Sequence, residues 1–148
     1  MKTNGLLLLK VFLVLIAAFH VVVGVGLNVS GGFPQTMATY YGAQKVNWTP
    51  ELVYMLHPLG AFMFVLGMLA VAAATNPLKH RATVFAFAAL FIIRGLQRIV
   101  FRQETVDLFG ISPTRNMINM VFFVGMGVVL LILYSYASRR ASDAPSSS

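Results

Sequence analysis

The sequence predicts an all-α membrane protein, an antiparallel bundle of four transmembrane helices. Three observations lead to this prediction: four long apolar runs, capping and proline residues at their ends, and an unusually apolar composition. Hydrophobic residues make up 58% of the 148-residue chain and charged residues only 10%, whereas soluble domains are nearer half apolar and a quarter charged. This composition favours lipid as the solvent, and the chain length suits a single domain.

Each apolar run has about the 20 residues that a helix needs to cross a hydrocarbon core. We expect the four helices at about 6–27, 51–74, 82–102 and 114–137. The runs lack the alternation of barrel strands, so helices are the structure that satisfies their backbone polar groups in lipid. The membrane domain is therefore predicted to cover 1–140, followed by a disordered cytoplasmic tail at 141–148 that is small and polar.

Helix-start signals precede two of the runs. Thr49-Pro50 and Ser112-Pro113 each combine an N-cap residue with a proline at the first helical position. The second run stops at Pro77, which cannot continue a helix. These signals predict where the second and fourth helices begin and where the second one ends.

The links between the runs determine how neighbouring helices are arranged. The links near 75–81 and 103–113 are short, so the helices that they join must run antiparallel. The first link is longer, and its segment 34–41 is expected to form a short helix at the membrane interface. Aromatic residues gather in and after this link, as they do in the aromatic belt of membrane proteins: Tyr40, Tyr41, Trp48 and Tyr54.

The basic residues predict the orientation. One side of the membrane is expected to carry Lys2, Lys10, Lys79, Arg81, Arg139 and Arg140, and the other Lys45, Arg102 and Arg115. Cytoplasmic loops carry the excess of Lys and Arg, so both termini are expected in the cytoplasm, with the protein in the plasma (inner) membrane. The net charge of +7 then reflects topology and lipid head groups. Nucleic-acid binding is not expected, because no basic patch alternates with exposed aromatics.

Polar side chains from all four helices are expected at one depth, in the leaflet away from the termini. Counting 1.5 Å per residue from the outer helix ends places these residues there: His20, His57, Arg94, Arg98 and Asn119. The spacing of Arg94, Arg98 and Arg102 forms one stripe along a helix. Because a buried arginine costs at least a few kcal/mol in a membrane, we expect Arg94 to point into the bundle.

Two hypotheses for this polar belt stay open. In the first, Arg94 and Arg98 hold the bundle together by pairing with helix-end carbonyls, Asn119 and Glu51. In the second, the belt binds an anionic lipid, a quinone or another ligand between the helices. Arginine is suited to this role because it binds phosphate, carboxylate or sulfate through paired hydrogen bonds.

The histidines suggest a further alternative. His20 and His57 are expected at equal depth on adjacent helices, and a pair of imidazoles can ligate the iron of haem b. The arginines would then meet the haem propionates. His57 is expected to face the bundle, because Gly60 and Gly67 on its helix permit close helix contact. The other reading is that both histidines are hydrogen-bonded within the bundle.

Other kinds of site find no support in the sequence. The chain has no cysteine, which excludes thiolate metal sites and cysteine nucleophiles. It has no P-loop, G-x-S-x-G or H-E-x-x-H pattern, so neither a catalytic residue nor a protein-bound metal is predicted. No carboxylate is expected in mid-membrane, and no polar path crosses the inner leaflet, so small-solute transport is the least favoured function.

Several short motifs follow one another along the chain: Pro34 with Tyr41-Gly42, Glu51 opening a helix that carries Gly60 and Gly67, a short proline-basic link, and Arg94-Gly95. This layout resembles the DoxX-like superfamily of small four-helix membrane proteins over most of the chain. The resemblance implies a four-helix bundle. It also implies a role as a small subunit of quinone-reducing complexes or in the assembly of other membrane proteins. It supplies no agreed catalytic residues.

Together these observations predict an accessory protein, a subunit or assembly factor for another membrane complex. The alternatives are a ligand-binding or redox subunit that holds a quinone, haem or anionic lipid, and a small-solute transporter. The expected partners are membrane lipid and other membrane-protein subunits. Glycines that permit helix contacts, with a partner or within the bundle, are Gly24, Gly60, Gly67, Gly125 and Gly127.

Overall fold

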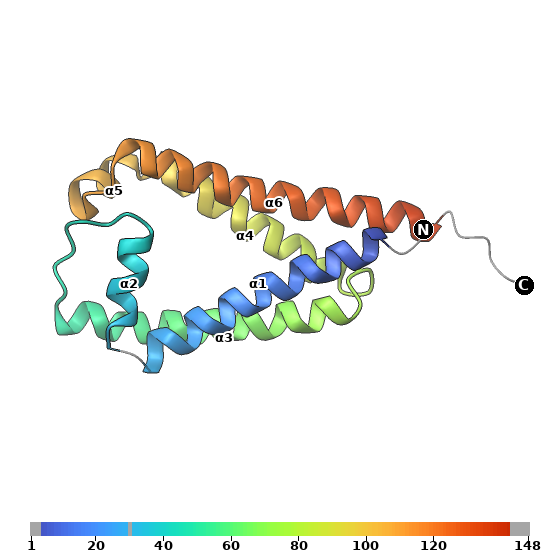
Figure 1. The fold of residues 1–148 in the computed structure, drawn as a ribbon, viewed down its shortest axis with the longest axis horizontal. Helices are drawn as coiled ribbons and strands as arrows, with labels where there is room; N and C mark the ends of the chain where they lie inside the picture. Colours follow the sequence, from blue (N-terminus) through green and yellow to red (C-terminus); the bar gives the residue numbers. More distant parts are fainter. Residues whose placement is uncertain (1–3, 30, 143–148) are drawn as a thin grey trace, which may run out of the picture.

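The structure is a computed structural model that describes residues 4–29 and 31–142. Its helices are α1 (Asn4–Val29), α2 (Phe33–Tyr40), α3 (Pro50–Thr75), α4 (Arg81–Val100), α5 (Arg102–Phe109) and α6 (Pro113–Ser142) (Figure 1). Four of them, α1, α3, α4 and α6, are long and apolar enough to cross a membrane. The predicted all-α fold with four spanning helices is confirmed.

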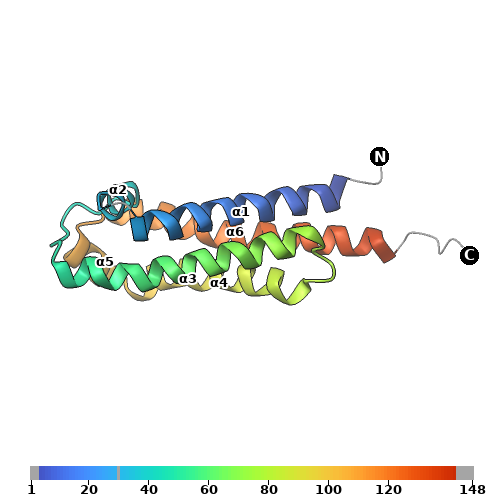
Figure 2. The ribbon, with the colours of Figure 1, turned by 90° about the horizontal axis from the view of Figure 1, so that it is seen from below.

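The long helices pack in pairs, α1 with α3 and α4 with α6. The pairs come together where α1 begins and α6 ends, which we call the terminal end, and separate toward the other end (Figure 1). Both α2 and α5 lie at that other end, the α2–α5 end (Figures 1 and 2). Buried side chains such as Leu13, Phe87 and Leu130 form the core that joins the two pairs.

Glycines allow the helices of each pair to touch. A side chain on Gly24 would come within 2.5 Å of the backbone nitrogen of Phe64, so α1 and α3 are in backbone contact there. In the other pair, a side chain on Gly127 would lie 2.8 Å from the carbonyl oxygen of Ala88. The glycines that the sequence offers for helix contacts thus serve contacts inside the protein. Gly125 differs, because the space in front of it is open.

The capping residues act as the sequence predicts. The Thr49 hydroxyl accepts a hydrogen bond from the Leu52 amide at 3.3 Å, at the start of α3. The Ser112 hydroxyl accepts one from the Arg115 amide at 3.2 Å, at the start of α6. Each bond satisfies an amide that has no partner within its own helix.

The predicted link at 103–113 differs from the structure, since most of it forms α5. The backbone leaves the helical conformation at Phe101, with φ −102° and ψ 34°, so α4 ends at Val100 and not at the expected residue 102. Gly110 then ends α5 with a φ of +66°, a left-handed conformation that glycine adopts without strain.

The ends of α1 and α6 also extend beyond the prediction. The first helix covers Asn4–Val29 where 6–27 was expected. The last helix continues to Ser142, so the first two residues of the predicted tail are helical, and residues 143–148 lie outside the described residues. The short helix expected at 34–41 is present as α2, at Phe33–Tyr40, and its place at the membrane interface stays a prediction.

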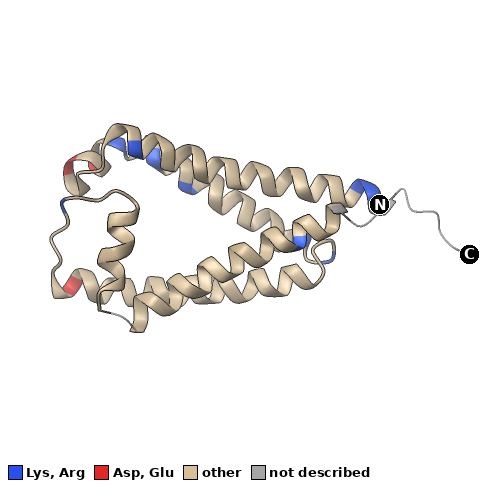
Figure 3. Ribbon diagram, in the orientation of Figure 1, with Lys and Arg blue, Asp and Glu red and all other residues tan. Residues whose placement is uncertain are grey.

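Charged residues are distributed unevenly between the two ends. Figure 3 shows Lys and Arg at both ends of the bundle, whereas the acidic residues of the described ranges gather at the α2–α5 end. These acidic residues are Glu51 at the start of α3 and Glu104 and Asp107 in α5. The polar belt predicted from the sequence lies just inside this end.

Candidate ligand-binding site

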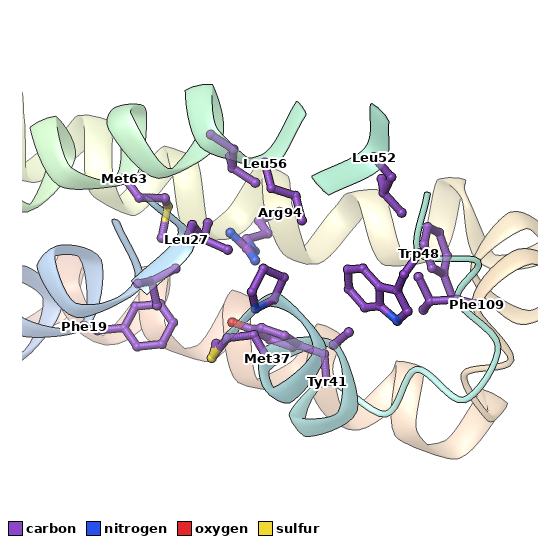
Figure 4. A pocket seen from close by; sticks show the side chains of 15 residues that line it. Phe19, Leu27, Met37, Tyr41, Trp48, Leu52, Leu56, Met63, Arg94 and Phe109 are labelled. Atoms are coloured by element: carbon purple, nitrogen blue, oxygen red, sulfur yellow. The ribbon is translucent and has the colours of Figure 1, made fainter. Parts of the chain in front are cut away.

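An apolar cavity of about 240 Å³ lies beneath α2, between the two helix pairs. Side chains from α1, α2, α3, α5 and the segment after α2 form its walls (Figure 4). Among the described residues that line it, Arg94 is the only charged one. The apolar lining includes Phe19, Leu27, Met37, Trp48, Leu56 and Met63.

Arg94 enters this cavity from α4 (Figure 4). Its guanidinium lies 4.7 Å from the ring centroid of Phe123 and 5.7 Å from that of Tyr41. Within the part of the chain that the structure describes, it makes no hydrogen bond or ion pair. Aromatic faces attract the positive charge but leave the five N–H donors of the group unsatisfied. These donors are therefore available to a molecule in the cavity.

The roof of the cavity is fixed by bonds from α6 to the last carbonyls of α2. The Asn119 side-chain amide donates to the carbonyl oxygen of Tyr41 at 3.0 Å. The guanidinium of Arg115 donates to the carbonyl oxygen of Tyr40 at 2.6 Å. Helix ends leave such carbonyls without partners, so these bonds both satisfy α2 and hold it over the cavity.

The segment after α2 is fixed to α5. The backbone amides of Gln44 and Lys45 both donate to the carbonyl oxygen of Phe109, at 2.8 and 3.1 Å. This attachment brings Trp48 and Phe109 to the same wall of the cavity. The long first link is therefore an ordered part of the site.

Arg98 has partners within the protein. Its guanidinium donates to the side-chain oxygen of Asn116 at 3.4 Å, and the Asn116 amide donates back to the carbonyl oxygen of Arg98 at 2.8 Å. The hypothesis that an arginine of the belt holds the bundle together by pairing within the protein therefore fits Arg98, and its partner is Asn116. The residue expected in that role, Asn119, bonds to α2 instead.

The two histidines do not share a cavity with Arg94. His20 is buried, its Nδ1 lies 2.8 Å from the carbonyl oxygen of Ile16, and its ring centroid is 5.6 Å from that of Phe87. His57 is exposed on α3, where its ring meets Tyr54 at 6.1 Å. The expectation that it faces the bundle is wrong: Gly60 and Gly67 do contact α1, but the side chain of His57 lies outside that contact and is exposed. This geometry gives the haem hypothesis no support.

A second cavity, of about 340 Å³, lies between α1 and α6. It shares Phe19 and Tyr41 with the first cavity, so these two side chains lie between the cavities. Arg115 and Asn119 supply its polar lining together with the tyrosines at the end of α2. The roles of Tyr41 and Arg115 were not predicted. In the sequence, Tyr41 stood out only as part of the aromatic belt, and Arg115 only as one of the basic residues used to predict the orientation.

Searches of protein-family models, curated proteins and solved structures found no match to this chain. The fold and the spans define its class: a small multi-pass membrane protein with four spanning helices. The resemblance to DoxX-like proteins stays a prediction, which rests on the short motifs quoted above.

Proposed function

We propose that this protein binds a lipophilic molecule with an anionic head group in the cavity beneath α2, and that Arg94 holds the head group. The observation that carries the proposal is an arginine that has no hydrogen-bonding partner among the described residues and lies in an otherwise apolar cavity. A carboxylate or phosphate would satisfy its donors through paired bonds. The aliphatic and aromatic walls would hold the hydrocarbon part.

The cost of placing an arginine in lipid supports this assignment. An arginine at the centre of a spanning helix costs about 2.5–3.5 kcal/mol, and Arg94, which lies in the half of α4 nearer the α2–α5 end, carries part of this cost where an apolar residue would carry none. A charge-assisted hydrogen bond contributes about 1.5–3 kcal/mol, so binding of an anionic ligand would offset the cost of the arginine. A neutral quinone would leave the positive charge in place, and for this reason we favour an anionic head group.

The accessory function predicted from the sequence has less support. It requires helix surfaces that a partner can approach closely, and small residues provide such surfaces in membranes. Most of the glycines considered for that purpose are in contact inside the protein, including Gly24, Gly60 and Gly127. The ligand-binding alternative therefore takes precedence over a subunit or assembly role.

Trp48 allows a direct test, because it is the single tryptophan of the chain and lines the cavity. The purified protein in a neutral detergent would be titrated with dibromostearate, whose bromine atoms quench indole fluorescence on contact. We expect saturable quenching, with weaker binding of the uncharged methyl ester. Arg94→Gln should weaken binding of the acid by about 10- to 100-fold, because it removes charge-assisted hydrogen bonds.

Arg81→Gln is the matched control, since Arg81 is an exposed arginine at the other end of the same helix. Its affinity for the brominated acid should equal that of the wild type. Equal affinity of Arg94→Gln and wild type, or equal affinity for acid and ester, would show that the cavity does not use Arg94 to bind an anion. Native mass spectrometry of gently extracted wild-type protein would identify the natural ligand by its mass.

A further inference from the structure

A groove of about 480 Å³ lies between α4 and α6 at the α2–α5 end, separate from the cavity that holds Arg94. Its polar lining consists of Arg98, Arg102, Thr114 and Asn116. Its apolar lining includes Ile99, Met117 and Met120. A surface that combines two arginines with apolar side chains is suited to an amphiphile.

The groove has a polar outer end, and its deepest lining residue is apolar. Arg102 and Thr114 lie where α5 and α6 begin, at the end of the bundle. Met120 lies about two turns further along α6, roughly 10 Å deeper at 1.5 Å per residue. The outer end of the groove is thus charged and its deepest part, at Met120, is apolar, which is the arrangement that a phospholipid in a membrane requires.

No carboxylate among the described residues forms an ion pair with the arginines of the groove. Asn116 orients Arg98 but is itself uncharged. Arg102 is exposed and makes no hydrogen bond or ion pair with a residue that the structure describes. The nearby carboxylate of Asp107 instead accepts a hydrogen bond from Gln103 at 2.9 Å. Two cationic groups are therefore left for an anion from outside the protein.

We infer that this groove binds an anionic phospholipid, with Arg98 and Arg102 on its phosphodiester and its acyl chains extending past Met120. Guanidinium groups match the phosphate oxygens in geometry and charge. A phospholipid is favoured over a protein segment because the groove combines two arginines near its outer end with an apolar residue, Met120, at its deepest point. The inference does not depend on the ligand proposed for the inner cavity.

Native mass spectrometry of the protein in mixed phosphatidylglycerol and phosphatidylcholine of equal chain length tests this inference. The wild type should retain phosphatidylglycerol in preference to phosphatidylcholine. Replacing both arginines, by Arg98→Gln with Arg102→Gln, should remove that preference, with a loss of about tenfold or more for each arginine. The matched control is Arg139→Gln with Arg140→Gln, which removes the same charge at the terminal end and should keep the preference.

Further variants keep the test decisive. Arg102→Gln alone changes an exposed side chain without hydrogen bonds to described residues, so it measures lipid preference even if the double variant does not fold. Arg94→Gln should keep the lipid preference, because Arg94 lines the inner cavity and not this groove. Equal retention of both lipids by the wild type, an equal loss in the terminal-end control, or a polypeptide in place of the lipid would each overturn the inference.

Discussion

Three arginines at regular helical spacing occupy three different environments. Arg94 lies against aromatic rings in a cavity, Arg98 exchanges hydrogen bonds with Asn116, and Arg102 is exposed. Helical geometry predicted their common stripe and the inward position of Arg94. It could not predict their partners, because these depend on how α4 is rotated against α6 and on the path of the chain through Tyr41.

The depth count from the sequence had a similar limit. It placed His20 and Asn119 in the membrane, and both are buried. It also placed His57 at that depth, but the side chain is exposed. Depth follows from the rise per residue alone. Whether a side chain is exposed depends also on how its helix is rotated against its neighbours, which the sequence does not show.

At the residue scale, we predict that Asn119→Ala loosens α2. The change removes the side-chain donor to the carbonyl oxygen of Tyr41 from a buried position, at a cost of about 1–2 kcal/mol. Hydrogen exchange measured by mass spectrometry should become faster in segment 33–43, while α4 keeps its protection. Asn116→Ala is the control, because its partner is Arg98 on α4. Faster exchange of α2 in this control, or unchanged exchange in Asn119→Ala, would contradict the assignment.

At the scale of elements, the sequence predicted the long helices well and the short α5 poorly. Long apolar runs in the sequence predict the spanning helices. Thr49 and Ser112 mark the starts of α3 and α6, and the structure confirms both. The segment of α5 has no buried residue and covers only Arg102–Phe109. An eight-residue polar helix lacks the apolar periodicity that would distinguish it from a loop.

The contact between α1 and α3 yields a prediction at this scale. Gly24→Ala should separate the helices, because the new Cβ would meet the backbone of Phe64, which cannot move as a side chain can. Overpacking of this kind costs about 1–3 kcal/mol. Thermal unfolding in detergent, followed by Trp48 fluorescence, should show a lower midpoint. Gly125→Ala is the control, since nothing lies within 4 Å of the added Cβ; an equal decrease there would rule out a specific helix contact.

At the scale of the whole molecule, the two ends differ in charge and shape. The terminal end carries Lys79 and the basic end of α6, and the α2–α5 end carries the acidic residues described above. We propose that the terminal end is the cytoplasmic one, because cytoplasmic segments of membrane proteins carry an excess of basic residues. The same orientation would place the α2–α5 end, and with it both proposed ligand sites, in the outer leaflet.

Single cysteines can test this orientation, because the natural chain has none. Lys45→Cys and Lys79→Cys place exposed thiols at opposite ends of the bundle. In intact cells, a maleimide that does not cross membranes should label residue 45 and leave residue 79 unlabelled until the membrane is opened. The cysteine-free parent protein provides the background. Labelling of residue 79 alone would reverse the proposed orientation.

The pairing of the helices also bears on how the chain is made. Each pair joins spans that are consecutive in the sequence, α1 with α3 and α4 with α6, so each is a hairpin that emerges from the ribosome as one stretch. The first hairpin can assemble before the second is translated, as domains generally do during synthesis. The cavity beneath α2 takes most of its apolar walls from the first hairpin and the link that follows α1, whereas Arg94 and Phe109 come from the second. If Arg94 holds the proposed ligand, a chain arrested after α3 would have a paired hairpin but would lack the residue that binds the head group.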